Sequence, residues 1–194
     1  MRFKEIKMKS VAIFCGSSSG NLPIFEETAY EAGKYLASQK CKVIYGGGKV
    51  GLMGKSADGA MENGGEVIGV LPKFMDGREV GHKYLNQLIW VKDMHERKTK
   101  MYDLSEGIIG LSGGFGTMDE MFESLTWGQL GLHEKPIGFL NLLGYYDHLF
   151  AQMDKMVEYG FLNPVNRSRV IIGDTIESLY QKMTNFEPIP AVWH

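Results

Sequence analysis

The chain alternates six short apolar runs with six segments of helical periodicity, and this alternation constrains its fold more than any other feature. Strands that are covered on both faces appear as continuous apolar runs, and strands that alternate with helices form parallel sheets. The pattern therefore predicts an α/β fold with a doubly wound parallel sheet flanked by helices. The runs are 11–15, 42–45, 66–70, 107–111, 136–140 and 169–172, and the expected helices are 23–38, 50–63, 93–105, 117–132, 145–159 and 174–184.

The rest of the chain gives no sign of a second domain. Residues 85–91 could form a further short strand, whereas 73–84 hold too many polar and glycine residues for a regular element and are expected to form a ligand-side loop. There is no internal repeat and no Pro/Ser-rich linker. The 194 residues are close to the size of one domain, so 1–194 are predicted to form a single nucleotide-binding domain.

The charge balance argues against nucleic-acid and membrane partners. Lys and Arg number 21 against 23 Asp and Glu, a net charge of -2, so no bulk positive field attracts a phosphate backbone or an anionic membrane. No run approaches the roughly 20 apolar residues of a membrane span, and the first ten residues lack the apolar stretch of a signal peptide. We expect a cytoplasmic protein.

A metal site is not expected either. The two cysteines, Cys15 and Cys41, form no CxxC or Cys/His cluster and are interpreted as buried thiols in strands. The five histidines show no HxH or HxxxH spacing. Any bound phosphate must therefore be held by local features of the chain.

Three glycine-rich turns follow apolar runs and are the candidates for that role. They are GSSSGN at 16–21, YGGGKVGLMG at 45–54 and SGGFGTMDE at 112–120. Glycine allows close backbone approach, and a helix N-terminus behind it offers unpaired N–H groups to an anion. A tight turn alone explains each loop, but three in one sheet favour phosphate binding. None has the Walker pattern, and the dinucleotide pattern is incomplete, so a monophosphate is favoured.

Two short segments carry candidate chemical groups. Thr117 and Glu120 have the spacing of a capping box, but a carboxylate just past a phosphate turn could also stabilise a sugar cation, and the two readings are compatible. Residues 93–101 resemble a helix start, capped by Asp93 and Glu96, that carries three cations at 97, 98 and 100. These cations either answer to a bound phosphate or form a solvated basic face.

These motifs together resemble one known family. FCGSSSGN, YGGGKVGLMG, MHERKTKM, SGGFGTMDE and TWGQLGLHEKPIGFLN, in that order from about Lys9 to about Thr184, closely resemble the LOG family of cytokinin riboside 5′-monophosphate phosphoribohydrolases. Members of that family have often been labelled lysine decarboxylases. The resemblance implies a Rossmann-like fold, no metal or organic cofactor, and a homodimer or an assembly of dimers.

The resemblance also implies roles for individual residues. Arg97 and Glu120 match the family's catalytic pair. One departure is that Ser112 stands where the family usually has proline, which should loosen the turn and alter affinity rather than abolish activity. The positions that match nucleotide-binding residues are Glu79, Lys98, Gly113, Gly114, Phe115, Gly116, Thr117, Met118, Asp119 and Thr126.

The activity expected from this resemblance is hydrolysis of the N-glycosidic bond of a purine nucleoside 5′-monophosphate of the cytokinin type, giving free base and ribose 5-phosphate. An enzyme acting on AMP or on nucleoside monophosphates in general, and a non-catalytic nucleotide or cofactor carrier, remain alternatives. A carrier would need the phosphate turns but not the Arg97 and Glu120 pair. The apolar residues of the helix expected at 117–132 exceed one core-facing stripe, so part of it should face another subunit unless the loop at 74–84 covers it.

Overall fold

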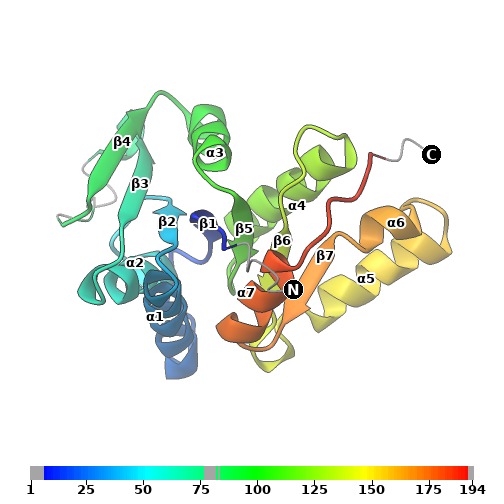
Figure 1. Cartoon of the computed structure of the whole chain (residues 1–194), viewed down its shortest axis with the longest axis horizontal. Helices are drawn as coiled ribbons and strands as arrows, with labels where there is room; N and C mark the ends of the chain where they lie inside the picture. Colours follow the sequence, from blue (N-terminus) through cyan, green and yellow to red (C-terminus); the bar gives the residue numbers. More distant parts are fainter. Residues whose placement is uncertain (1–6, 77–81, 83, 192–194) are drawn as a thin grey trace, which may run out of the picture.

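The computed structural model describes residues 7–76, 82 and 84–191 of the chain. In these residues seven parallel strands form one sheet in the order β4-β3-β2-β1-β5-β6-β7 (Figure 1). The further short strand considered for residues 85–91 is present as β4, and it forms one edge of the sheet. The strands are β1 (Ser10–Phe14), β2 (Lys42–Tyr45), β3 (Val67–Pro72), β4 (Gln87–Val91), β5 (Gly107–Gly110), β6 (Ile137–Leu140) and β7 (Val170–Gly173).

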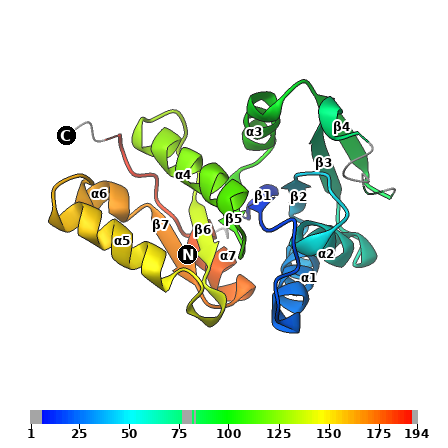
Figure 2. The same ribbon diagram turned by 180° about the vertical axis from the view of Figure 1, so that it is seen from behind.

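Helices cover both faces of the sheet, as the sequence predicts (Figures 1 and 2). One layer holds α1 (Pro23–Ser38), α2 (Gly51–Glu62) and α7 (Ile176–Thr184). The other holds α3 (Met94–Asp103), α4 (Phe115–Gln129) and α5 (Asp147–Glu158), and the four-residue helix α6 (Pro164–Arg167), which was not expected, follows α5. Short 3-10 turns at Lys73–Met75 and Leu142–Gly144 complete the described elements.

The sheet separates two hydrophobic cores because successive strand residues point to opposite faces. In β1, Val11 and Ile13 join the core under α1, α2 and α7, whereas Ala12 and Phe14 join the core under α3, α4 and α5. This burial on both sides explains why the strands are continuous apolar runs in the sequence. Cys15 and Cys41 are buried free thiols as expected, although each lies one residue outside its strand rather than within it.

The strand order reverses at β1, which pairs with β2 on one side and β5 on the other. The three glycine-rich turns follow these three strands, so they meet at the carboxyl edge where open α/β sheets bind ligands. Backbone hydrogen bonds join the turns: the Gly16 N–H donates to the Ser112 carbonyl at 3.0 Å, and the Leu52 and Met53 N–H groups donate to the Gly16 carbonyl at 3.0 and 3.4 Å. Among the described helices, none is long and apolar enough to cross a membrane.

Candidate active site

A cavity of about 250 Å³ opens at the switch point of the sheet. The turns after β1 and β5 form two of its walls, and side chains from α2, α3 and α4 form the rest. Two of the charged residues singled out in the sequence, one from α3 and one from α4, therefore face the same space. The lining residues are Cys15, Gly16, Ser17, Met53, Met94, Arg97, Gly114, Phe115, Gly116, Thr117 and Glu120.

The N-terminus of α4 lines this cavity and is its candidate anion site. Gly114 is its N-cap and has no side chain to offer, and the first turn contains no acidic residue. The N–H groups of Gly114, Phe115, Gly116 and Thr117 consequently have no intrahelical acceptor and no side-chain cap. In contrast, Asp93 caps α3, and the Gly16 carbonyl accepts from the first amides of α2. The positive end of the α4 dipole is thus left for a ligand.

The expected capping box at Thr117 is wrong. The helix begins two residues earlier, at Phe115, so Thr117 lies inside the first turn and cannot be its N-cap. Gly113 and Gly114 allow this earlier start, because their backbone freedom lets the chain turn directly into the helix at Gly114. Thr117 is buried against Gly113, where an added Cβ would come 2.1 Å from the Thr117 Oγ1. The close approach of Thr117 therefore requires glycine at position 113.

Glu120 is the buried acid of the cavity, with 9% of its surface exposed. Its carboxyl group accepts no hydrogen bond from the residues that the structure describes. Burial raises its pKa to about 7, the nearby charges of Asp119 and Glu123 add to this rise, and the cations Arg97 and Lys98 oppose it. A carboxyl group with a pKa near neutrality can change its protonation state under physiological conditions, which suits acid–base or electrostatic catalysis.

Arg97 is the buried cation of the cavity and is held by backbone groups. Its Nε donates to the Val70 carbonyl at 3.1 Å, and its Nη2 donates to the Gly46 carbonyl at 2.8 Å. No carboxylate of the described residues forms a direct ion pair with it. Its charge is thus positioned without being neutralised, which leaves it able to interact with a substrate.

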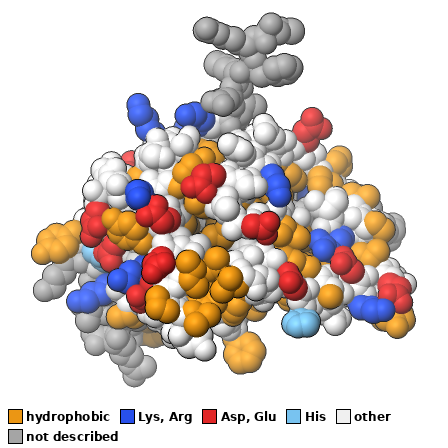
Figure 3. Space-filling view, turned by 90° about the horizontal axis from the view of Figure 1, so that it is seen from below, with side chains coloured by type: hydrophobic (Ala, Val, Ile, Leu, Met, Phe, Trp, Pro, Cys, Tyr) orange, Lys and Arg blue, Asp and Glu red, His pale blue; other side chains and the backbone are white. Residues whose placement is uncertain are grey.

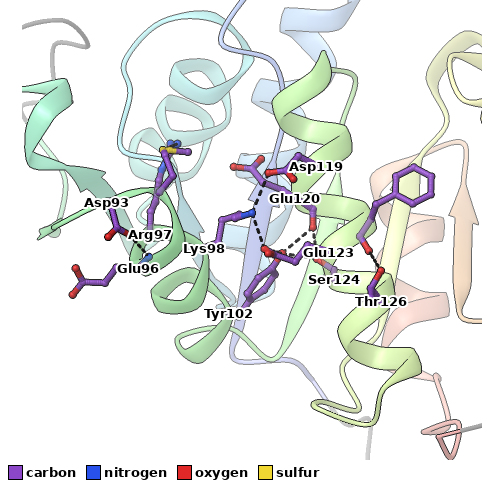
Figure 4. Close-up of polar contacts among 12 residues, drawn as sticks. Asp93, Glu96, Arg97, Lys98, Tyr102, Asp119, Glu120, Glu123, Ser124 and Thr126 are labelled. Atoms are coloured by element: carbon purple, nitrogen blue, oxygen red, sulfur yellow. Dashed lines mark hydrogen bonds and ion pairs between the residues drawn. The ribbon is translucent and has the colours of Figure 1, made fainter. Parts of the chain in front are cut away.

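Lys98, the next residue, points away from the cavity. Its ammonium group lies 3.1 Å from Asp119 and 3.1 Å from Glu123, so it joins α3 to α4 (Figure 4). The neighbouring Tyr102 hydroxyl donates to the Glu120 carbonyl at 2.8 Å and adds a second link between the helices. Of the three cations at 97, 98 and 100, only Arg97 lines the cavity.

The other predicted binding residues are spread over a wider region. Phe115 stands at the cavity mouth and is 96% exposed, whereas Met118 packs partly against the core. Asp119 is exposed and engages Lys98. Thr126 lies farther along α4, where its hydroxyl donates to the Phe122 carbonyl at 2.8 Å. Glu79 lies outside the described residues.

Sequence analysis did not foresee the roles of two positions near the site, Gly46 within the glycine-rich turn at 45–54 and Tyr145. Gly46 must lack a side chain, because an added Cβ would come 1.9 Å from the Arg97 Nη2. Tyr145 lines a second cavity, of about 210 Å³, which adjoins the first at Gly16 and Gly114. The signal for Tyr145 was its place just after β6, at the same edge of the sheet as the glycine turns.

Comparisons with known proteins agree with this architecture. A family described as "possible lysine decarboxylase" matches residues 53–183. The cytokinin riboside 5′-monophosphate phosphoribohydrolase LOG1 of Arabidopsis thaliana is 40% identical over 184 residues, covering 95% of this chain and 86% of the relative. The probable cytokinin riboside 5′-monophosphate phosphoribohydrolase LOGL2 of Oryza sativa subsp. japonica is 40% identical over 184 residues, covering 95% of this chain and 75% of the relative.

A solved structure shows the same fold at lower identity. The molybdenum cofactor binding protein of Rippkaea orientalis superposes with a TM-score of 0.67 at 21% identity, covering 89% of this chain and 93% of that protein. Its likeness concerns the fold alone. Among the described residues, no three His, Cys, Asp or Glu side chains are grouped as a metal site requires.

Proposed function

Because the chain belongs to the family of cytokinin riboside 5′-monophosphate phosphoribohydrolases, whose sequence model is described as "possible lysine decarboxylase", we propose that it hydrolyses the N-glycosidic bond of a purine nucleoside 5′-monophosphate. The bond between the ribose C1′ and the base nitrogen breaks, and its electron pair leaves with the base. Water supplies a hydroxyl group to C1′ and a proton to the base. The products are the free base and ribose 5-phosphate.

The residues of the cavity supply the groups that this reaction needs. The free N–H groups at the start of α4 bind the 5′-phosphate. Glu120, one turn farther on, lies at the ribose, where its carboxylate stabilises the positive charge that develops as the base departs. Arg97 donates hydrogen bonds that orient the substrate. Lys98, the turn from Gly113 to Asp119, Thr126 and Glu79 complete the proposed binding residues, with Lys98 and Asp119 acting through the link between α3 and α4.

One observation carries the proposal: Glu120 is a buried carboxyl group that accepts no hydrogen bond from the described residues, and it lies beside an uncapped helix N-terminus. Burying an unpaired carboxylate is costly, and a carrier needs the phosphate site without this acid. A non-catalytic nucleotide or cofactor carrier therefore leaves Glu120 unexplained.

The direct test is chromatographic detection of free base after incubation with AMP and with isopentenyladenosine monophosphate. Replacing Glu120 by Gln should lower turnover about 100- to 10,000-fold, because it removes the charge while keeping the shape. The matched control is Glu31→Gln, since Glu31 is exposed on α1 and pairs with Lys34. Near-normal turnover in a folded Glu120→Gln protein would refute the catalytic role, and nucleotide binding without release of base would favour the carrier.

The preferred base is proposed to be of the cytokinin type, as in the names of the relatives. The ratio of kcat/KM for isopentenyladenosine monophosphate over AMP measures this preference, and a ratio below one favours the general nucleotide alternative. We also propose that residues 1–194 act as one domain, that the protein assembles as a homodimer or a set of dimers, and that it resides in the cytoplasm. Two buried free cysteines support a reducing compartment.

A further inference from the structure

Three consecutive carbonyl groups in the turn between β5 and α4 are each held by a hydrogen bond from outside the turn. The Tyr146 hydroxyl donates to the Leu111 carbonyl at 2.5 Å. The Gly16 N–H donates to the Ser112 carbonyl at 3.0 Å. The Tyr145 hydroxyl donates to the Gly113 carbonyl at 2.6 Å. The orientation of each peptide group in this turn is therefore set by a partner on another element.

The direction of each carbonyl also fixes the direction of the next amide. In a planar trans peptide group, the C=O of one residue and the N–H of the next point in opposite directions. The Gly113 carbonyl points to Tyr145, so the Gly114 N–H points away from it. Gly114 lines the cavity that contains Arg97 and Glu120, and its amide is the first of the four open N–H groups of α4.

Tyr145 is itself held firmly. Its ring makes edge contacts with the rings of Tyr146, at 4.9 Å between centroids, and Phe25, at 6.0 Å. The turn that presents it is pinned where the Asn141 side chain accepts from the Tyr146 N–H at 2.8 Å. The Gly113–Gly114 pair has little stiffness of its own, since glycine has wide backbone freedom. The tyrosine hydroxyl thus gives this flexible pair a fixed reference point.

We propose that Tyr145 is a positioning residue for phosphate binding: its hydroxyl holds the Gly113 peptide so that the Gly114 N–H faces the phosphate of the substrate. This inference rests on the proposed function for the identity of the substrate. It does not require catalysis, because an anion bound at the α4 N-terminus uses the same amides. Tyr145 touches the turn and not the reacting atoms.

The test is Tyr145→Phe, which removes the hydroxyl and keeps the ring contacts. One hydrogen bond of this kind contributes a factor of about 3 to 10 in an equilibrium constant. We expect KM for the nucleoside monophosphate to rise about 3- to 10-fold with kcat within about twofold. The dissociation constant of ribose 5-phosphate, measured by titration calorimetry, should rise by the same factor. Binding of a nucleoside that lacks the phosphate should not change.

The matched control is Tyr30→Phe, which removes a hydroxyl that donates to Glu62 on the surface at 2.8 Å. It should leave both constants unchanged. Equal affinity of wild type and Tyr145→Phe for ribose 5-phosphate would overturn the proposal, as would a fall in kcat at unchanged KM. If no nucleotide is hydrolysed but Tyr145→Phe still weakens ribose 5-phosphate binding, the positioning role holds and the proposed function fails. Because Tyr145 is 45% exposed, we expect Tyr145→Phe to fold. Circular dichroism identifies a temperature at which the wild type and the variant are both folded, and calorimetry at that temperature compares binding without an effect of stability.

Discussion

At the scale of single residues, Glu120 is placed where catalysis and stability make opposite demands. Burial raises its pKa from the ordinary value of 4.5 to about 7, so the folded protein favours the protonated form more than the unfolded chain does. The site needs the ionised form if the carboxylate is to stabilise a sugar cation. In the proposed mechanism, ionising Glu120 therefore produces the active form and weakens the fold at the same time.

The pH dependence of both properties follows from this raised pKa. The rate at low substrate concentration should rise with pH through a limb near 7 and fall about tenfold per pH unit well below it. The folded state carries no penalty from Glu120 below about pH 4.5, a growing penalty between 4.5 and 7, and the full penalty above 7. Glu120→Gln should therefore be more stable than wild type at pH 8, by up to about 3 kcal/mol, and not at pH 4. Urea unfolding at the two pH values measures this, and equal stabilities at pH 8 would contradict the assignment of the cost to Glu120.

Lys98 should influence turnover more than substrate affinity. Arg97 and Lys98 are neighbours on α3, and Asp119 and Glu120 are neighbours on α4, so the pair formed by Lys98 and Asp119 holds Arg97 opposite Glu120. Lys98→Met should lower kcat about tenfold and change KM less than twofold, because the catalytic pair loses its alignment. In the Lys98→Met protein, the further change Asp119→Asn should lower kcat less than it does in the wild type, because both changes break the same ion pair between Lys98 and Asp119.

The control for this experiment is Lys100→Met, a lysine on the same helix that forms no ion pair with any described residue. A KM that rises with kcat unchanged would instead show that Lys98 contacts the phosphate directly, as the resemblance to the family implied. The sequence could place Lys98 beside the site but could not give its direction. The direction depends on which carboxylates α4 presents to α3, and this is set by how the two helices pack.

At the scale of elements, the turn between β2 and α2 determines the position of Arg97. The Gly46 carbonyl accepts from Arg97, and the space over its Cα is occupied by the guanidinium group. Gly46→Ala should lower activity about 100-fold, since a displacement of about 1 Å in a catalytic group has an effect of that size. The control is Gly128→Ala, where the nearest atom to an added Cβ is at 3.4 Å. The measurement is the rate of base release by the two variants and the wild type, at a temperature at which all three are folded. Full activity of Gly46→Ala would show that the position of Arg97 is not critical.

The same scale shows what the sequence could and could not predict. Strand and helix positions followed from hydrophobic periodicity, because burial on both sides of a parallel sheet leaves a strong pattern. The start of α4 did not, because Thr117 and Glu120 imitate a capping box and the glycines permit an earlier start. The three glycine turns were found from composition and order. Tyr145 was not singled out, and Gly46 was named only as part of a turn, because their roles depend on contacts with Arg97 and Gly113 that are distant in sequence.

At the scale of the whole molecule, the acidic and basic residues nearly balance, and several large apolar side chains are exposed. On the face drawn in Figure 3, acidic and basic side chains alternate among apolar ones, in keeping with the net charge of -2. The proposed phosphate site therefore depends on local groups rather than on a bulk positive field. At the end of α4, Leu130 and Leu132 are 38% and 67% exposed, and Tyr159 and Phe161 at the end of α5 are also exposed.

These exposed residues lead to a prediction about assembly. Light scattering at micromolar concentration should give a mass of at least twice the 21.7 kDa of one chain. Replacing Leu130 and Leu132 by Glu should shift the mass to that of a monomer and lower activity, because α4 carries Glu120 and would lose its support. Two surface changes on α1, Glu27→Gln and Glu31→Gln, serve as the control. A monomeric wild type with full activity would contradict the dimer.

The main-chain anchoring of the site has an evolutionary consequence. Arg97 and Tyr145 donate to carbonyl oxygens, and every residue type carries a carbonyl oxygen. Mutations that replace the side chain at Val70 leave that acceptor in place, so neighbouring positions can drift without coordinated second mutations. A relative with 40% overall identity could then differ at such positions and still offer the same carbonyl acceptors. Selection should act most strictly where the acceptor also has to lack a side chain, as at Gly46.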